Sequence, residues 1–274
     1  MHAEPKSVTQ TIPFDDTFFF FIPSPNRFPF RHWQTEIEPW HELPSGKWGK
    51  RRIDTAVFWA ENLPKPICLV WDNVAPELFE NGNDDSILQF SLNGQSLNPA
   101  EDPQESSPHQ LRFDLNHHLW PGENTLTVMS ASSTRQPIVV QDTLALEGEF
   151  AVRQFKKREI LTLPPMHLQL GSWTEQGFPF FTGTGIYRQK LNIIDFNENA
   201  SYLLRMERIT DMAEITINNT FVGPMQDSRE AINITHALQA GENLFEFRID
   251  NTKQEPTQPS KPSGLLGPVF LEVY

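Results

Sequence analysis

Residues 113–128, FDLNHHLWPGENTLTV, recur without a gap as residues 232–247, INITHALQAGENLFEF. The two stretches share a His, a Leu and the triplet Gly-Glu-Asn at matching positions, and their apolar positions match in kind. Before each stretch a strand-like run ends in a pair that tolerates positive φ, Asn93-Gly94 and Asn218-Asn219, as hairpin turns require. This internal repeat predicts two copies of one structural unit.

Strand signals dominate from Ile53 to Tyr274, and helix signals are scarce. Hydrophobic residues fall in short runs that are separated by Pro, Gly, Asn and Asp. In residues 245–249, for example, Phe and Ile alternate with Glu and Arg, a period of two that buries one face of a strand. Such strands predict an all-β fold of antiparallel sandwiches, with helix limited to short turns near Asn116–Leu119 and Thr235–Leu238.

The repeat also predicts the domain organisation. Two β-sandwiches are expected, residues 51–154 and residues 155–274, with a boundary in the charged segment Arg153–Glu159. Residues 1–50 lie outside the repeat, and their prolines and tryptophans indicate an extended segment packed on the first sandwich. We expect the two sandwiches to superimpose so that their Gly-Glu-Asn triplets overlay.

The charge balance excludes two classes of partner. The 274 residues include 22 Lys and Arg against 35 Asp and Glu, giving a formal net charge of −13. Binding to nucleic acid or to an anionic membrane surface depends on Lys and Arg. We therefore expect no nucleic-acid partner and no membrane insertion, since the apolar run Phe18–Ile22 is too short to cross a bilayer.

The sequence shows no clear sign of a signal peptide or of a reactive cysteine. Residues 1–11 contain no apolar stretch, so no signal peptide is visible in this chain. The one cysteine, Cys68, excludes an intrachain disulfide and lies in the apolar run Ile67–Trp71. We expect it to be a buried small hydrophobe rather than a reactive thiol.

The second half carries a more specific pattern. Its elements are GIYRQKL (185–191), AEITINN (213–219), the Gly-Glu-Asn triplet and GLLGPV (264–269). This half resembles the galactose-binding-like jelly-roll domains that act as sugar-binding domains in family 2 glycoside hydrolases. The first half resembles them through fewer residues. The junction LEGEFAV (146–152), with residues 170–180, is similar to the C-terminal accessory part of bacterial α-L-rhamnosidase-like enzymes.

This resemblance implies two tandem jelly-roll β-sandwiches that form a non-catalytic carbohydrate-binding or bracing module pair of a bacterial glycoside hydrolase. It implies a role in polysaccharide degradation, a periplasmic or extracellular location, and a glycan or an adjacent catalytic domain as partner. Two alternatives remain open. The chain is a small glycoside hydrolase or lyase in its own right, or it is a structural or protein-interaction β-sandwich.

Candidate catalytic groups are weak. Glycoside hydrolysis needs two carboxylates about 5–10 Å apart. Acidic residues cluster around the turn signal Asn81-Gly82-Asn83, namely Asp72, Glu77, Glu80, Asp84 and Asp85. A solvated loop explains this cluster best, although its oxygen atoms could also hold a structural calcium ion. We expect no catalytic residue, no other cofactor and no transition-metal site, since His117, His118 and His236 lie in the repeated turn.

The candidate carbohydrate site is the aromatic-rich loop Gly171–Gly185 with the strand that follows it. Sugars stack their apolar faces on flat rings and exchange hydrogen bonds with polar side chains nearby. In this interpretation Trp173 stacks on a sugar ring and Glu175 and Gln176 bind hydroxyl groups. The predicted contact residues are Trp173, Glu175, Gln176, Phe180, Tyr187 and Arg188. The alternative is that the aromatic rings fill an interface and that Arg188 forms an ion pair.

Overall fold

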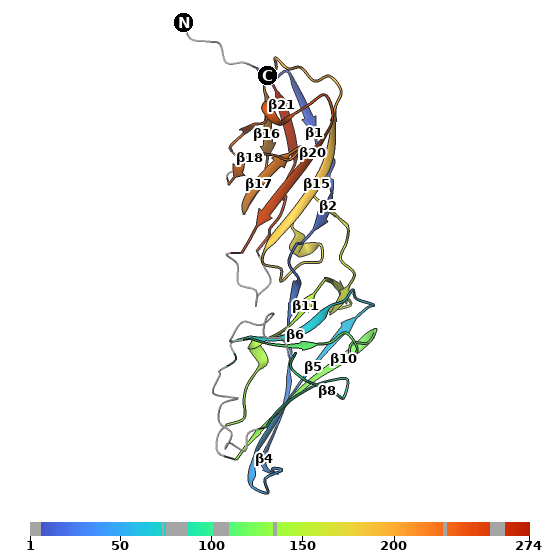
Figure 1. Ribbon diagram of the computed structural model, residues 1–274, viewed down its shortest axis with the longest axis vertical. Helices are drawn as coiled ribbons and strands as arrows, with labels where there is room; N and C mark the ends of the chain where they lie inside the picture. Colours follow the sequence, from blue (N-terminus) through green and yellow to red (C-terminus); the bar gives the residue numbers. More distant parts are fainter. Residues whose placement is uncertain are drawn as a thin grey trace. The chain divides into compact units, whose positions relative to one another are not determined.

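A computed structural model describes residues 7–72, 74, 87–100, 110–133, 136–226, 229–252 and 261–274. The chain divides into two compact units, unit 1 (Met1–Ser24 and Pro165–Tyr274) and unit 2 (Pro25–Pro164). Figure 1 shows that both are built from strands. In the described ranges helix is limited to three 3₁₀ turns, which confirms the all-β prediction: η1 (Gln141–Thr143), η2 (Trp173–Glu175) and η3 (Thr235–Ala237). None of these turns is long and apolar enough to cross a membrane.

The described residues of unit 2 form two sheets. The larger has the order β12-β13-β5-β10-β7-β8, with β4 also paired to β5, and the smaller has the order β3-β11-β6-β9. All pairs are antiparallel except β13 with β5, which run parallel. The bounds are β3 (Asn26–Pro29), β4 (Gln34–Glu42), β5 (Trp48–Ala60), β6 (Ile67–Asp72), β7 (Ile87–Leu92), β8 (Gln95–Leu97), β9 (Gln110–Asp114), β10 (Gly122–Ser132), β11 (Leu144–Gly148), β12 (Ala151–Phe155) and β13 (Arg158–Thr162).

In the part of unit 1 that the structure describes there are also two sheets, and all of their strand pairs are antiparallel. The larger has the order β14-β2-β15-β20-β17-β18, and the smaller has the order β1-β21-β16-β19. The bounds are β1 (Gln10–Pro13), β2 (Thr17–Phe21), β14 (His167–Gln169), β15 (Thr184–Ile193), β16 (Tyr202–Met206), β17 (Met212–Ile217), β18 (Thr220–Met225), β19 (Ile232–Asn233), β20 (Gly241–Asp250) and β21 (Val269–Val273).

Each unit encloses an aromatic core between its two sheets. In unit 2, Phe90 of β7 lies 4.6 Å from Phe113 of β9, ring centre to ring centre, across the two sheets. In unit 1, Phe14 meets Phe245 of β20 edge-on at 4.8 Å. The alternation seen in the sequence places Phe245 and Phe247 wholly inside. Burial of each such ring contributes about 1.5–3 kcal/mol to folding.

The two units share one strand order, as the repeat predicts. The path β3-β11-β6-β9 in unit 2 corresponds to β1-β21-β16-β19 in unit 1, and β5-β10-β7-β8 corresponds to β15-β20-β17-β18. The register agrees as well. Gly122 lies opposite Ala60, and its repeat partner Gly241 lies opposite Ile193.

The strongest correspondence is a hydrogen-bond network around Asn124 and Asn243, both fully buried. The Asn124 amide donates to the Trp120 and Gly122 carbonyl oxygens, and it accepts from the Trp120 N–H and the Asn93 amide. Asn243 makes the same four bonds to the equivalent groups of unit 1, and its side-chain partner is Asn218. Asn93 and Asn218 have positive φ values of 54° and 50°. The amide therefore closes the repeated turn in both units.

The N-terminal segment differs from the prediction. Residues 1–50 do not all pack on the first sandwich, because β1 pairs with β21 and β2 pairs with β14 and β15 of unit 1. Only the part from residue 25 onward belongs to unit 2. The reason is that β1 and β3 are equivalent strands that each cover one edge of a four-stranded sheet. The boundary also falls later than expected, after Pro164, because β12 and β13 form a hairpin on the edge of β5.

Replacing Asn243 or Asn124 by Ala is expected to destabilise its unit by about 1–3 kcal/mol, because buried backbone groups and an amide lose their partners. Asn199→Ala is the control, since that side chain is exposed on a turn. Chemical denaturation measures the free energy of unfolding. Unchanged midpoints for both buried-site variants would show that the network is not required for stability.

Candidate functional site

The aromatic side chains of the predicted carbohydrate loop lie in the core of unit 1. Trp173 begins the turn η2, which Ser172 caps by accepting a hydrogen bond from the Thr174 N–H. Trp173 and Tyr187 are 0% exposed, and Phe180 is 1% exposed. A ring without an exposed face cannot stack on a sugar, so these three residues act as core side chains in this structure.

Glycine residues allow these rings to pack closely. Trp173 stacks on Tyr187 with ring centres 6.4 Å apart and an angle of 14° between the planes. A Cβ atom at Gly185 would collide with the Trp173 indole, and one at Gly264 would collide with the Tyr187 hydroxyl. Burial raises the pKa of Tyr187 well above its usual value, so the phenol stays neutral. The glycines that indicated a loop therefore make room for a packed cluster.

The polar residues of the predicted site already have partners. The Gln176 side chain accepts from the Gln169 N–H at 2.9 Å and donates to the Gln169 carbonyl oxygen at 3.0 Å. Arg188 pairs with Glu246 at 2.7 Å and lies over the Phe21 ring. Glu175 is exposed in the first turn of η2. The six predicted residues thus divide between the core and the surface of unit 1, and they do not meet in one exposed site.

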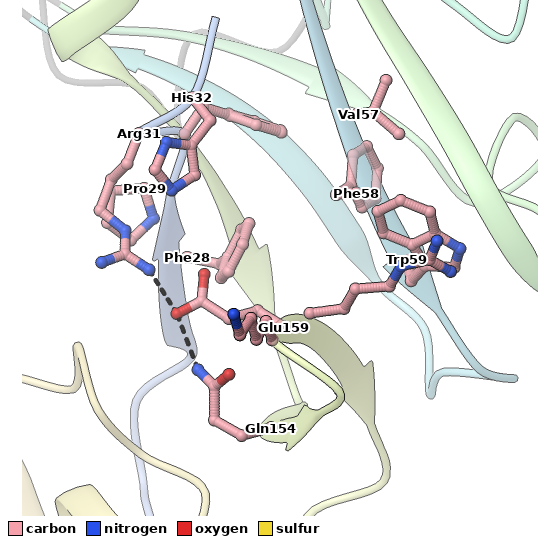
Figure 2. A pocket seen from close by; sticks show the side chains of 12 residues that line it. Phe28, Pro29, Arg31, His32, Val57, Phe58, Trp59, Gln154 and Glu159 are labelled. Carbon is pink, nitrogen blue, oxygen red and sulfur yellow. Dashed lines mark hydrogen bonds and ion pairs between the residues drawn. The ribbon is translucent and has the colours of Figure 1, made fainter.

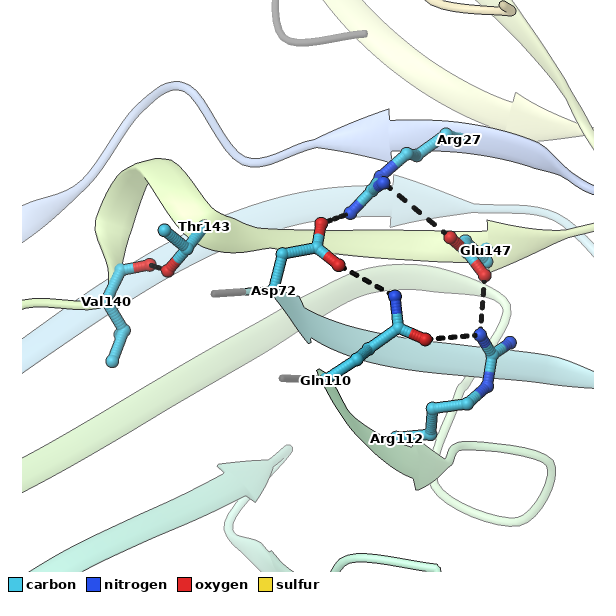
Figure 3. A network of polar contacts seen from close by, with 7 residues as sticks. All are labelled: Arg27, Asp72, Gln110, Arg112, Val140, Thr143 and Glu147. Atoms are coloured by element: carbon cyan, nitrogen blue, oxygen red, sulfur yellow. Dashed lines mark hydrogen bonds and ion pairs between the residues drawn. The ribbon is translucent and has the colours of Figure 1, made fainter. Parts of the chain in front are cut away.

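The acidic cluster is described only at its first residue. Glu77, Glu80, Asp84 and Asp85 lie outside the described residues, so calcium binding there stays a prediction. Asp72 belongs to a ladder of polar contacts on the outer face of the smaller sheet of unit 2 (Figure 3). Its contacts are an ion pair with Arg27 and a hydrogen bond from Gln110, and the ladder continues from Arg112 to Glu147. Within the described ranges, no group of three or more His, Cys, Asp or Glu is placed to hold a metal ion.

Cys68 lies on β6 beside this ladder and is half-buried. Burial raises the pKa of its thiol, although the Arg112 guanidinium acts in the opposite direction. A raised pKa reduces the fraction of thiolate near neutral pH, and thiolate is the reactive form. The raised pKa of Cys68 therefore leaves less thiolate in the folded chain than a free cysteine would have.

A surface pocket of unit 2 brings together the side chains best suited to bind a ligand. Its volume is about 240 Å³. Figure 2 shows Arg31 and His32 on one side, Val57 and Trp59 on the opposite side, and Glu159 between them. The full lining is Phe28, Pro29, Phe30, Arg31, His32, Val57, Phe58, Trp59, Gln154, Lys157, Arg158 and Glu159.

The hairpin of β12 and β13 forms one wall of this pocket. Its turn contains Lys156 and Lys157, both with positive φ. The hairpin reaches β5 through the parallel pairing of Ile160 with Trp59. This pairing carries the Arg158 guanidinium over the Trp59 ring, 4.3 Å from the ring centre, within the range of a cation–π contact.

The polar groups on the other side of the pocket are held in place. Arg31 forms an ion pair with Glu159, and the Gln154 amide donates to the same carboxylate at 3.1 Å. The Trp33 indole N–H donates to the Phe30 carbonyl oxygen at 3.1 Å, which fixes the chain that carries Arg31. A second pocket, of about 350 Å³, shares Arg31, His32 and Val57 with the first and extends it towards Thr55.

The sequence patterns described above did not predict this pocket, although the sequence contains one signal for it. IPFDD (12–16) and FPFRH (28–32) form a short second repeat. The structure confirms that they are equivalent, because the Phe14 N–H donates to the Val269 carbonyl oxygen and the Phe30 N–H donates to that of Leu144. Aligning these stretches would have placed a strand of each unit in the N-terminal segment. It would also have singled out the change from Asp-Asp to Arg-His.

Comparison with known proteins gives only loose similarity. No protein-family model matches the chain, and no curated protein matches it. Among solved structures, a rhamnosidase from Novosphingobium sp. PP1Y has a TM-score of 0.35 and 19% identity over 88% of this chain and 25% of that one. An α-L-rhamnosidase from Streptomyces avermitilis has a TM-score of 0.31 and 12% identity, over 97% of this chain and 27% of that one. A putative β-galactosidase from Bacteroides fragilis has a TM-score of 0.32 and 11% identity, over 83% of this chain and 36% of that one.

These neighbours are glycoside hydrolases, and the resemblance is a loose glycoside-hydrolase-like one. The chain spans between 25% and 36% of the length of the three proteins.

Replacing Trp173 by Ala is expected to destabilise unit 1 by about 3–5 kcal/mol, because it empties a fully enclosed site. Trp40→Ala is the matched control, since the Trp40 side chain is 76% exposed. The free energy of unfolding is measured by denaturant titration. Equal stability of the two variants would contradict the core position of Trp173.

Cys68 is expected to react with iodoacetamide at pH 7.5 at least about tenfold more slowly in the folded chain than in denaturant, because its raised pKa and its burial reduce reactive thiolate. Above neutral pH the folded rate should keep rising after a free thiol has reached its plateau. Mass spectrometry follows the adduct. A folded rate that equals the unfolded rate would overturn this assignment.

Proposed function

We propose that the chain is a non-catalytic carbohydrate-binding module pair of a bacterial glycoside hydrolase, built from two galactose-binding-like jelly-roll sandwiches. The observation that carries this proposal is the pocket of unit 2. It combines apolar walls with fixed polar groups, which is the mixture that a sugar site requires.

The composition of the pocket supports a glycan ligand. Val57 and the half-buried Trp59 ring, which the Arg158 guanidinium covers on one face, form an apolar wall beside a bound sugar ring. Glu159, Gln154 and Arg31 offer acceptors and donors to hydroxyl groups. The volume of about 240 Å³ is slightly below the range of about 300–1,000 Å³ for typical small-molecule sites, so a short glycan segment is the best fit.

The carboxylates argue for binding rather than catalysis at this pocket. Glycoside hydrolysis uses a pair of Asp or Glu residues on either side of the scissile bond. Of the described residues that line the pocket, Glu159 alone is acidic, and its carboxylate is already engaged by Arg31 and Gln154. The alternative of a small independent hydrolase therefore has no second carboxylate here.

A bracing role beside an adjacent catalytic domain is the second candidate, and one observation favours it. The hairpin of β4 and β5 exposes Ile37, Trp40 and Trp48, at 60%, 76% and 58%. Exposed apolar groups gathered on one element are typical of protein contact surfaces. Bracing and glycan binding are compatible, because the hairpin tip and the pocket use different residues.

Titration with oligosaccharides tests the proposal. The protein is titrated with a panel of plant and bacterial glycans. The backbone amide signals whose chemical shifts change are expected to belong to residues of the unit 2 pocket. Trp59→Ala should weaken binding by at least about tenfold, since it removes an apolar wall, whereas Trp40→Ala should leave the affinity unchanged. Shift changes confined to another surface, or no binding by any glycan, would contradict the pocket assignment.

A further inference from the structure

The sign of the charge in the unit 2 pocket is opposite to that of the whole chain. The formal net charge of the protein is −13. Arg31, Lys157 and Arg158 line the pocket against a single acidic residue, Glu159, and His32 adds an imidazole. A basic hollow in an acidic protein attracts anions locally, because nearby charges dominate the potential inside a concave site.

Unit 1 provides an internal comparison, since it has the same strand order without this charge. The residues equivalent to Arg31 and His32 are Asp15 and Asp16, because Pro13 and Pro29 occupy matching register positions opposite Phe270 and Ala145. The basic pair is therefore not a requirement of the fold.

The aromatic wall and the hairpin are also specific to unit 2. Trp59 lies opposite Glu123, and the equivalent residue opposite Glu242 is Asn192. Among the described residues of unit 1, only β20 pairs with Asn192 and Ile193, so no strand takes the place of β13. Each feature that makes the pocket is thus an addition to the shared scaffold.

The position of Arg158 favours an anion over a neutral sugar. Its guanidinium lies over the Trp59 ring, so a neutral sugar that stacked on that face would have to displace it. An anionic group can instead bind the guanidinium where it is, because stacking leaves the in-plane N–H donors available for a charge-assisted contact. Within the described part of the chain, neither Lys157 nor Arg158 forms an ion pair that would compete.

We infer that the unit 2 pocket selects anionic glycans, with Arg158 and Lys157 at a carboxylate or sulfate group and Val57 and Trp59 beside the ring. This inference rests on the proposed function, because it names the class of glycan for the same pocket. Arg158 is the principal specificity residue, since it carries the charge to the aromatic wall.

Calorimetric titration with matched oligosaccharides tests the inference. The ligands are oligogalacturonates, their neutral methyl esters and a sulfated galactan oligosaccharide. We expect at least one of the two anionic ligands to bind about tenfold or more tightly than the esters, and to weaken as NaCl rises from about 50 to 300 mM. Stronger binding of the carboxylated or of the sulfated ligand identifies the anion.

Two matched charge-removing variants test whether Arg158 is responsible for the selectivity towards anionic glycans. Arg158→Gln should reduce the affinity for the anionic ligand by about tenfold and leave that for the esters unchanged. Lys190→Gln removes the same charge from an exposed strand position of unit 1 and should change neither. Thermal melting of each variant confirms that the fold is retained.

The outcomes separate this inference from the proposed function. Equal affinity for oligogalacturonates and esters, lost in Trp59→Ala, would overturn the anionic selectivity and leave glycan binding intact. Selectivity that survives Arg158→Gln would overturn the role of Arg158. No binding by any glycan would overturn both proposals.

Discussion

The buried amide of the repeated turn is the interaction on which each unit depends. In unit 2 the Asn124 amide joins the chain before β10 to the turn after β7, and in unit 1 the Asn243 amide does the same for β20 and β17. The strands β10 and β20 are central to the larger sheets. Because the amide fixes where these strands begin, it also fixes the register of the neighbours that pair with them. With the register fixed, the apolar side chains of the two sheets in each unit can pack against one another.

The scaffold is duplicated, but the edges of the larger sheets are not. Strand order and turn chemistry are the same in both units, whereas the hairpin of β12 and β13 occurs beside β5 alone among the described strands. Loops and edges tolerate such change because few core contacts depend on them. The pocket with Trp59 and Arg158 lies at this altered edge, which is where a duplicated fold can acquire a new site at small cost in stability.

The sequence predicted the all-β class, the repeat and the short turn at Thr235–Ala237, because alternation and turn residues are local signals, but residues 116–118 form a turn without 3₁₀ helix and the turns η1 and η2 were not predicted. Alternation and turn residues did not show that β1 belongs with β21, because a four-residue strand is too short for a periodic pattern, and the signal lay in the similarity of residues 12–16 to residues 28–32. The sequence patterns also misjudged Trp173. A loop rich in glycine and aromatic residues suggests exposure, yet the glycines at 185 and 264 admit rings into the core. The pocket depends on the long-range pairing of β13 with β5, which no local pattern encodes.

The sequence of unit 2 is inserted between β2 and β14 of unit 1. During synthesis on the ribosome, β1 and β2 therefore emerge long before their partner strands. Gln10, for example, can pair with Val273 only when almost the whole chain has been made. Unit 2 is contiguous and can fold as soon as it has left the exit tunnel. Until β14 and β15 have emerged, the strand Thr17–Phe21, with its run of four phenylalanines, is an unpaired apolar segment. The nascent chain therefore carries two unpaired strands, β1 and β2, for the whole interval in which unit 2 is synthesised.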